Sequence, residues 1–173
     1  MKKDFMKAMF LMLCAVFAFT FTACSDDDDP ADDAATQVAG SYSGTLDVTM
    51  LGNPLIEDEQ KTIVLAKNTE NSINLSIANF SLDITGLGTV NLGDVTISNC
   101  TLTPSGEGHA FSGTVHLTNL TLPGVGQGDC DVNIENATVI GNTLTLPLGI
   151  DVFMPGTTTE LPLDIKANFT GTK

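Results

Sequence analysis

Apolar and polar residues alternate strictly along most of this chain from about Val38 onward, and no other feature constrains the fold as strongly. Successive side chains of a β-strand point to opposite faces, so each alternating run predicts a half-buried strand. The apolar side of the first run comprises Tyr42, Gly44, Leu46, Val48 and Met50. Seven further runs, separated by Gly, Pro, Asn and Asp, cover Lys61–Ala66, Ser72–Phe80, Asp94–Leu102, His109–Leu120, Asp131–Val139, Thr143–Val152 and Glu160–Phe169. No window after Cys24 has a helical repeat of apolar residues, which predicts an all-β domain with at most a short helical turn.

Eight consecutive antiparallel strands with one apolar face predict an up-and-down barrel over residues 38–173. Closure into a barrel removes the unpaired edges that an open sheet would leave, and an open β-sandwich is the alternative. The two longer connections, Asp83–Gly93 and Pro123–Asp129, are expected to be loops that could gate one mouth of the barrel.

Part of the strand pattern occurs twice. The segment Leu75–Leu82 resembles Val115–Leu122, and Asp94–Thr101 resembles Asp131–Thr138, which indicates a duplicated two-strand unit, with chance similarity between β-rich sequences as the alternative. The apolar parity switches at Asn79 in the first copy and at Asn119 in the second. A β-bulge at each Asn would return both halves of the strand to the core.

The first residues have the features of an export signal. Met1–Lys7 is basic and Ala8–Phe21 is apolar, but this stretch is too short to span a bilayer of about 30 Å, so residues 1–23 are interpreted as a signal peptide. The sequence Phe21-Thr22-Ala23-Cys24 resembles the lipobox of bacterial lipoproteins. That resemblance implies cleavage before Cys24 and lipidation of its thiol; an ordinary signal-peptidase site followed by a free Cys is the alternative.

An acidic run follows the predicted anchor, and residues 24–37 are expected to form a solvated tether. Ser25, Asp26, Asp27, Asp28 and Asp29 also resemble the surface-export signal of Bacteroidetes-type lipoproteins. The resemblance implies a lipid-anchored protein of the outer membrane that is exposed on the cell surface. Retention on the periplasmic leaflet is the alternative, and in either case the membrane is a partner through the lipid.

Three short segments are similar to a known family. Val38–Leu46, Asn79–Leu82 and Asn168–Lys173 resemble the calycin-like β-barrel domain of Bacteroides-type lipoproteins, over about residues 38–173. The resemblance implies a lipocalin-like barrel and no particular activity. The Gly-x-Trp signature of lipocalins is missing, because the chain has no Trp.

Charge and residue chemistry exclude several functions. The net charge is −14, with seven basic residues, all Lys, so a basic surface for nucleic acid is missing. His109 and His116 lie on opposite faces of one predicted strand, His109 near the strand entrance and His116 toward water, which disfavours a paired-His metal site. The acidic groups Glu57-Asp58-Glu59 and Asp129, Asp131, Glu135 lack the spacing of a calcium loop and are interpreted as solvated charge. Without a nucleophile elbow either, the chain is expected to be non-enzymatic and to need no cofactor.

Two roles remain open. The barrel could bind a small neutral apolar ligand, since the chain has no Arg to hold a carboxylate and Lys166 falls on the outward side of its strand. Alternatively, Leu, Ile and Val fill the interior, and the barrel is a structural or protein-interaction module of the cell envelope whose partner the sequence does not identify.

Cys100 and Cys130 would ordinarily be paired in an exported protein. In an up-and-down barrel their strands run in the same direction and are not neighbours, so the two residues lie at opposite ends, on the order of 25 Å apart. Both are therefore predicted to be free thiols.

Overall fold

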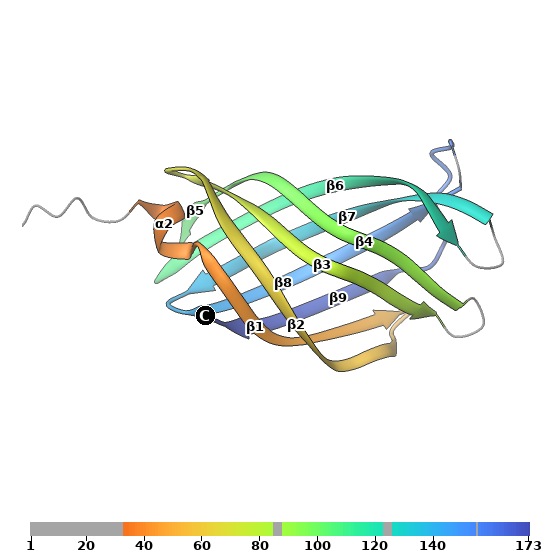
Figure 1. The fold of residues 1–173 in the computed structure, drawn as a ribbon, viewed down its shortest axis with the longest axis horizontal. Helices are drawn as coiled ribbons and strands as arrows, with labels where there is room; N and C mark the ends of the chain where they lie inside the picture. The colour runs from red at the N-terminus through yellow and green to blue at the C-terminus, as the bar shows by residue number, and fades with distance from the viewer. Residues whose placement is uncertain (1–32, 85–87, 123–125, 155) are drawn as a thin grey trace, which may run out of the picture. The chain divides into compact units, whose positions relative to one another are not determined.

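The structure is a computed structural model that describes residues 33–84, 88–122, 126–154 and 156–173. These residues form one short helix and nine strands (Figure 1). In chain order they are α2 (Ala34–Val38), β1 (Gly40–Met50), β2 (Asn53–Thr69), β3 (Ser72–Ile84), β4 (Gly88–Thr101), β5 (Thr103–Ser105), β6 (Gly108–Leu122), β7 (Gly126–Ile140), β8 (Thr143–Phe153) and β9 (Ile165–Thr172).

The strands form one antiparallel sheet in the order β4-β3-β2-β1-β9-β8-β7-β6-β5. This order is an up-and-down meander in which the first and last long strands pair, β1 with β9, so the all-β prediction is confirmed. The strand count of eight is wrong by one. The additional strand, β5, pairs with only Gly108–Ala110 across a turn at Gly106, and three residues are too few to show an alternating pattern.

The barrel is joined tightly at one end and loosely at the other. At the end where α2 lies, here called the helix end, β5 continues the path of β4 and pairs with β6, which closes the ring. Beyond that pairing, β4 and β6 run next to each other without a ladder and separate toward the opposite, distal end (Figure 1). Similarly, β2 pairs with β3 only between Ile63–Thr69 and Ser72–Ile77. Both joints of the barrel therefore loosen toward the distal end.

The apolar side of each strand forms one continuous core. Tyr42, Leu46 and Val48 of β1 are buried as their parity predicts, and the largest fully buried side chains include Phe80 and Phe169. No polar or charged residue of the described segments is buried. Burial of one large apolar side chain stabilises a fold by about 1.5–3 kcal/mol, so this core is the main source of stability.

Five bulges of the sheet share one kind of hydrogen bond, from a backbone N–H to a side-chain oxygen of the neighbouring strand. Asn79 and Asn119 have φ values of 50° and 59° and lie where the register shifts, which confirms the two predicted bulges. In each case the backbone N–H donates to a carboxylate of the neighbouring strand, Asp94 or Asp129. Three further positions have a positive φ and the same kind of bond: Asp58 donates to Asp47, Asn99 to Asn74, and Asn136 to Ser112. Asn99 and Asn136 are equivalent in the proposed duplication, which supports a repeated β3–β4 and β6–β7 unit.

Helix α2 covers the helix end of the barrel. Asp33 caps the helix by accepting a hydrogen bond from the Thr36 N–H at 2.8 Å, and Ala35 and Val38 are buried against the core. The Tyr42 hydroxyl donates to the Val38 carbonyl at 2.6 Å. Residues 33–37 of the expected tether are therefore structured, because Ala35 of this segment and Val38 directly after it are buried in the core.

The long loop expected over Asp83–Gly93 is largely strand. Leu82 pairs with Val90 and Asp83 pairs with Thr89, so β3 continues to Ile84 and β4 begins at Gly88. The prediction failed because a register shift near Gly93, whose φ is 71°, interrupts the alternation. The expected loop Pro123–Asp129 likewise contains the start of β7 at Gly126.

Candidate functional site

The predicted lipidation and export residues, Cys24 and Ser25, Asp26, Asp27, Asp28 and Asp29, lie outside the described residues. The helices of the described part include none that is long and apolar enough to cross a membrane.

Side chains fill the inside of the barrel. Inward-facing residues from strands around the ring, such as Ile63, Leu75 and Val132, have exposed fractions of 0–1%. A side chain that lined a void large enough for water would retain some accessible surface, so these residues contact other protein atoms on all sides. The values rise to 5–7% at Val90, Leu92 and Leu102, and the inward-facing side chains of β6 from Val115 to Leu120 are only partly buried. This arrangement corresponds to the filled-barrel interpretation.

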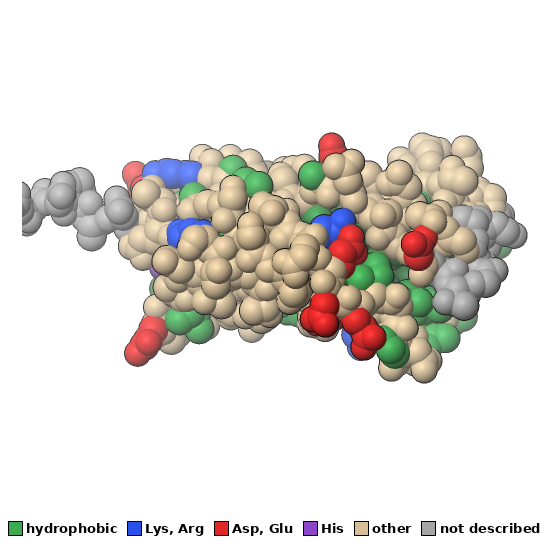
Figure 2. Space-filling model, turned by 60° about the horizontal axis from the view of Figure 1, so that its bottom comes forward, with side chains coloured by type: hydrophobic (Ala, Val, Ile, Leu, Met, Phe, Trp, Pro, Cys, Tyr) green, Lys and Arg blue, Asp and Glu red, His purple; other side chains and the backbone are tan. Residues whose placement is uncertain are grey.

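An apolar cluster lies at the distal end of the barrel. It is formed by the β1–β2 hairpin and the segment before β9, which the Leu51 N–H joins by a 3.1 Å hydrogen bond to the Asp164 carbonyl. Figure 2 shows hydrophobic side chains at this end with acidic side chains beside them. The distal apolar cluster comprises Met50, Leu51, Leu55, Ile56, Leu161 and Leu163; Leu51 is 58% exposed and the others are partly buried.

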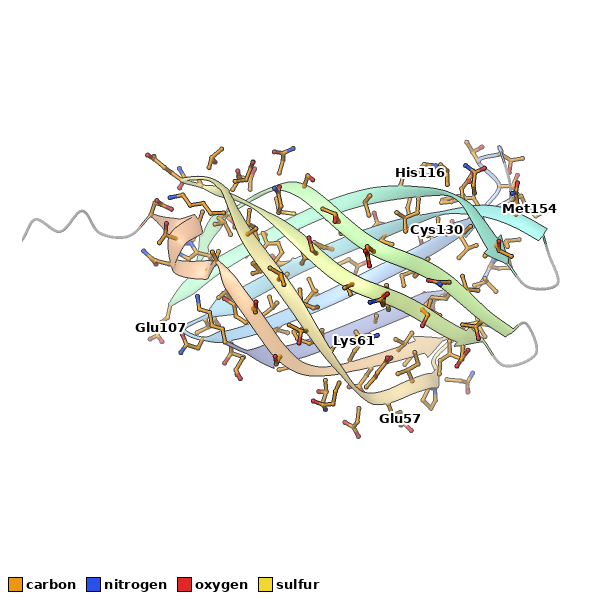
Figure 3. All side chains as sticks on the ribbon, viewed as in Figure 1. Glu57, Lys61, Glu107, His116, Cys130 and Met154 are labelled. Carbon is orange, nitrogen blue, oxygen red and sulfur yellow. The ribbon has the colours of Figure 1, made fainter. Side chains whose placement is uncertain are left out.

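Charged side chains of β2 border this cluster. Two of them, Glu59 and Lys61, lie on the inward side of the strand, which the sequence analysis did not predict. Glu59 pairs with Leu46 and Lys61 pairs with Gly44, so both fall on the inward side of β2. The Lys61 ammonium lies 2.9 Å from a Glu59 carboxylate oxygen and donates to the Asn79 carbonyl at 3.4 Å. Lys61 thus reaches across the joint where β2 and β3 no longer pair; Figure 3 labels it together with Glu57. The sequence did contain a sign of this position, because Lys61 is two residues from the buried Ile63 and therefore on the same face of the strand.

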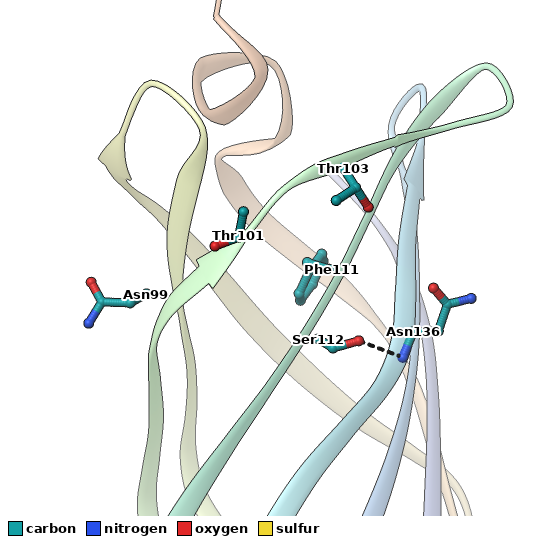
Figure 4. Close-up of a pocket in the computed structure, with 6 residues that line it drawn as sticks. All are labelled: Asn99, Thr101, Thr103, Phe111, Ser112 and Asn136. Atoms are coloured by element: carbon teal, nitrogen blue, oxygen red, sulfur yellow. Dashed lines mark hydrogen bonds between the residues drawn. The ribbon is translucent and has the colours of Figure 1, made fainter.

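A polar pocket lies on the outside of the barrel, where β4 and β5 meet β6 (Figure 4). Its volume is about 290 Å³, and it is lined by Asn99, Thr101, Thr103, Phe111, Ser112 and Asn136. The polar groups are amides and hydroxyls with no charged side chain among them. The Phe111 ring is only 2% exposed, so it offers no face on which a sugar could stack. Its lining contains no carboxyl, imidazole, amine or thiol group.

The two histidines lie apart, as predicted. His116 points outward from β6, and its Nδ1 lies 2.6 Å from an Asp131 oxygen on β7. His109 is near the helix end, where its Nε2 is 3.4 Å from the Gln37 amide oxygen and its buried Nδ1 has no hydrogen-bond partner in the described part of the chain. Among residues 33–84, 88–122, 126–154 and 156–173, no group of three or more His, Cys, Asp or Glu side chains could hold a metal ion.

Both thiols are free and buried, which confirms the prediction for Cys100 and Cys130. Cys100 lies near the end of β4 at the helix end, and Cys130 lies near the start of β7 at the distal end, where Figure 3 shows it. Burial raises the pKa of Cys130 to about 12, with a further contribution from the charges of nearby aspartates. A thiol with such a pKa is almost entirely protonated at neutral pH and is a poor nucleophile.

Ionic contacts fix α2 on the barrel. Lys67 binds the Asp33 carboxylate, and this hydrogen bond is the main reason that the pKa of Asp33 is lowered from 3.8. The contribution of this carboxylate to helix docking is therefore complete above pH 3.8 and is lost as the pH falls through the lowered pKa. Lys173 donates to the carbonyls of Gln37 and Ala39 at 2.6 and 3.0 Å. Outward-pointing Lys166, by contrast, pairs with Asp164 at 3.5 Å and is well exposed.

Comparison with known proteins assigns the family. The model of the calycin-like β-barrel domain matches residues 38–172, and the chain belongs to this family. A solved structure of a presumed outer membrane protein from Bacteroides fragilis has a similar fold, with a TM-score of 0.55 at 18% sequence identity. The match covers 82% of this chain and 53% of the other, so this chain spans about half the length of that protein. No curated protein matches the sequence.

Proposed function

We propose that the protein is a non-enzymatic, lipid-anchored outer-membrane protein whose filled barrel serves as a protein-interaction module. The burial of the inward-facing side chains carries this proposal: with exposed fractions of 0–2% over most of the core, the barrel leaves little room for a ligand. An interior of eight long strands is just wide enough for side chains to fill it. The polar outer pocket has no titratable side chain to activate its hydroxyls, and the raised pKa of Cys130 keeps that thiol protonated.

Native mass spectrometry of the purified mature protein tests the proposal. The expected result is a mass equal to that of the lipidated polypeptide, unchanged after incubation with a panel of neutral lipids. A stoichiometric apolar adduct that resists collisional activation would refute the filled barrel as the functional state.

A small neutral apolar ligand at the distal end is the second candidate, favoured by the half-buried cluster of Met50, Leu55 and Leu163. Hexadecanol is a suitable probe because it is apolar and uncharged. If this function holds, Leu55→Ser and Leu163→Ser reduce its binding at least tenfold, whereas Val64→Ser, at an apolar position that is 40% exposed outside the cluster, leaves binding unchanged. Absence of saturable binding to the unmodified protein excludes this candidate.

Anchoring through Cys24 is supported by the lipobox-like residues before it. A palmitate analogue supplied to growing cells is expected to label the unmodified protein and not the Cys24→Ala variant. Label on the variant would show that another residue carries the lipid.

Surface display is supported by Ser25 and the four aspartates Asp26–Asp29. Replacement of these aspartates by Ala is expected to protect the barrel from protease added to intact cells, while total protein stays constant. Equal digestion of both forms would instead assign this run to a plain spacer, and protection of the unmodified protein would place it on the periplasmic leaflet.

A further inference from the structure

The turn between β1 and β2 places a leucine at a position that disfavours it. Leu51 and Gly52 form a two-residue hairpin loop between the paired residues Met50 and Asn53, and their φ values of 52° and 77° are both positive. Such a loop favours Asn, Asp or Gly, because a bulky side chain at positive φ crowds the backbone. The Leu51 side chain is 58% exposed, so burial in the fold offsets little of this strain. A strained and exposed apolar residue indicates a contact outside the fold.

Leu51 continues the distal apolar cluster at the tip of the hairpin. Other members, among them Leu55, Ile56 and Leu163, pack on the core with one side and stay partly exposed. Strand β2 pairs with β3 only from Ile63 onward, and no described strand pairs with the rest of that side of β2. Residues 24–32 of the predicted tether precede α2, so they join the barrel at the helix end and not at this surface. Among the described residues, the cluster therefore lacks a covering element.

Carboxylates without a cation border the cluster. Glu57 and Glu160 are exposed and directly adjoin cluster residues in the sequence, and Figure 2 shows acidic side chains beside the apolar ones. The four lysines of the described residues all contact other oxygen atoms of the chain: Lys61, Lys67, Lys166 and Lys173. Apolar groups alone, placed over the cluster, would strip water from these two carboxylates without replacing it, which is unfavourable. The surface therefore favours apolar groups that are accompanied by positive charge.

We infer that the distal apolar cluster binds a polypeptide segment of another protein in which apolar side chains are flanked by Lys or Arg. The apolar side chains cover Leu51 and its neighbours, and the cations pair with Glu57 and Glu160. An open surface at the tip of a hairpin suits a polypeptide better than a small molecule, which needs an enclosed pocket.

The same charges disfavour two other occupants. A second copy of this chain presents the same carboxylates in a protein with a net charge of −14, and an anionic lipid surface is repelled in the same way. The inference rests on the proposed role as an interaction module, and it names the surface and the chemistry of the partner.

A synthetic amphipathic peptide of Leu and Lys is the probe. Its binding to the lipidated mature protein in phosphatidylcholine nanodiscs is measured by surface plasmon resonance, with empty nanodiscs as the reference. At physiological salt, where the screening length is about 8 Å, binding is expected to be saturable. Glu57→Gln with Glu160→Gln is expected to weaken it about fivefold, the effect of two exposed ion pairs. Glu70→Gln with Glu107→Gln removes the same charge from two exposed turns at the helix end and is expected to leave binding unchanged; Figure 3 labels Glu57 and Glu107 at opposite ends.

Leu51→Asn separates binding from folding. Asn tolerates positive φ, so this variant is expected to unfold at a higher temperature and at the same time to bind the peptide about tenfold more weakly. Ile140→Asn is the matched control, because Ile140 is 53% exposed at the end of β7 and its φ is not positive. Its replacement is expected to leave peptide binding unchanged without raising the unfolding temperature.

Several results overturn the inference. Absence of saturable binding, normal binding by Leu51→Asn, or equal losses in the two glutamate pairs would show that the cluster does not hold the peptide. Equal binding of a peptide with Glu in place of every Lys would show that charge has no part in recognition. A doubled protein mass that Leu51→Asn returns to that of the monomer would assign the cluster to a second copy. An apolar adduct in the mass spectrum, by contrast, refutes the proposed function whether or not the peptide binds.

Discussion

Gly113 tests how the barrel closes, because a single added carbon at this position meets the opposite strand. A Cβ built there would lie 2.8 Å from Cys100 Sγ and 2.8 Å from Ile97 Cγ2, closer than ordinary contacts between such atoms. Relief requires β4 and β6 to move apart or both side chains to leave their preferred positions, and overpacking of this kind costs about 1–3 kcal/mol. Replacing Gly by Ala within a strand restores about 0.5–1 kcal/mol of that through the unfolded state. The expected net loss for Gly113→Ala is about 1–2 kcal/mol.

Urea denaturation followed by circular dichroism measures this loss. For a slope of about 1.5 kcal/mol per molar, the midpoint of Gly113→Ala is expected about 1 M below that of the unmodified protein. Gly149→Ala on β8 is the matched control, since its Cβ would meet only a Glu135 carboxylate oxygen at 3.3 Å, at the end of a flexible side chain. Its midpoint is expected to be unchanged or slightly higher.

A double-mutant cycle isolates the contact with Cys100. Cys100→Ala removes one of the two atoms that the new Cβ would meet, so the double variant is expected to lose about 1 kcal/mol less than the sum of the single variants. Equal stability of Gly113→Ala and the unmodified protein would show that β4 and β6 do not meet at this point. Strict additivity in the cycle would show that the loss of stability does not arise from contact with Cys100.

Three further measurements follow from the structure. Titration of the unfolded, unreduced protein is expected to find both Cys100 and Cys130 as thiols, and a count of zero would refute the strand order. In the folded protein, Cys130 is expected to react about a thousandfold more slowly than an ordinary thiol, and the free energy of unfolding is expected to fall as the pH rises from 9 toward the raised pKa of Cys130, about 12. Lys173→Ala is expected to lower the free energy of unfolding by about 1 kcal/mol and to speed amide exchange in α2; unchanged exchange would show that the two hydrogen bonds do not hold the helix. Asp94→Ala is expected to destabilise the bulge at Asn79 by about 1 kcal/mol, whereas Asp94→Asn, which keeps an accepting oxygen, retains most of the stability; equal losses would assign the effect to charge.

Local pattern was sufficient for much of the fold. Period-two alternation identified the strands and the inward side of β1, because the geometry of a strand alone places successive side chains on opposite faces. The parity switches at Asn79 and Asn119 likewise located two bulges, since a bulge is the local way to shift parity without losing the core face. The free state of Cys100 and Cys130 followed from strand order, which short connections between neighbouring strands determine.

What the tertiary structure decided depends on contacts between segments far apart in the sequence. The sequence did not show that β4 and β6 adjoin without a ladder, that Glu59 and Lys61 face inward at a loosened joint, or that Ala35 and Val38 draw part of the tether onto the barrel. Alternation states which face of a strand is apolar, but it contains no information about how far apart two strands lie or where their pairing stops. Those distances are set by how the whole ring of side chains packs, and the loosening of both joints toward the distal end is a consequence of that packing.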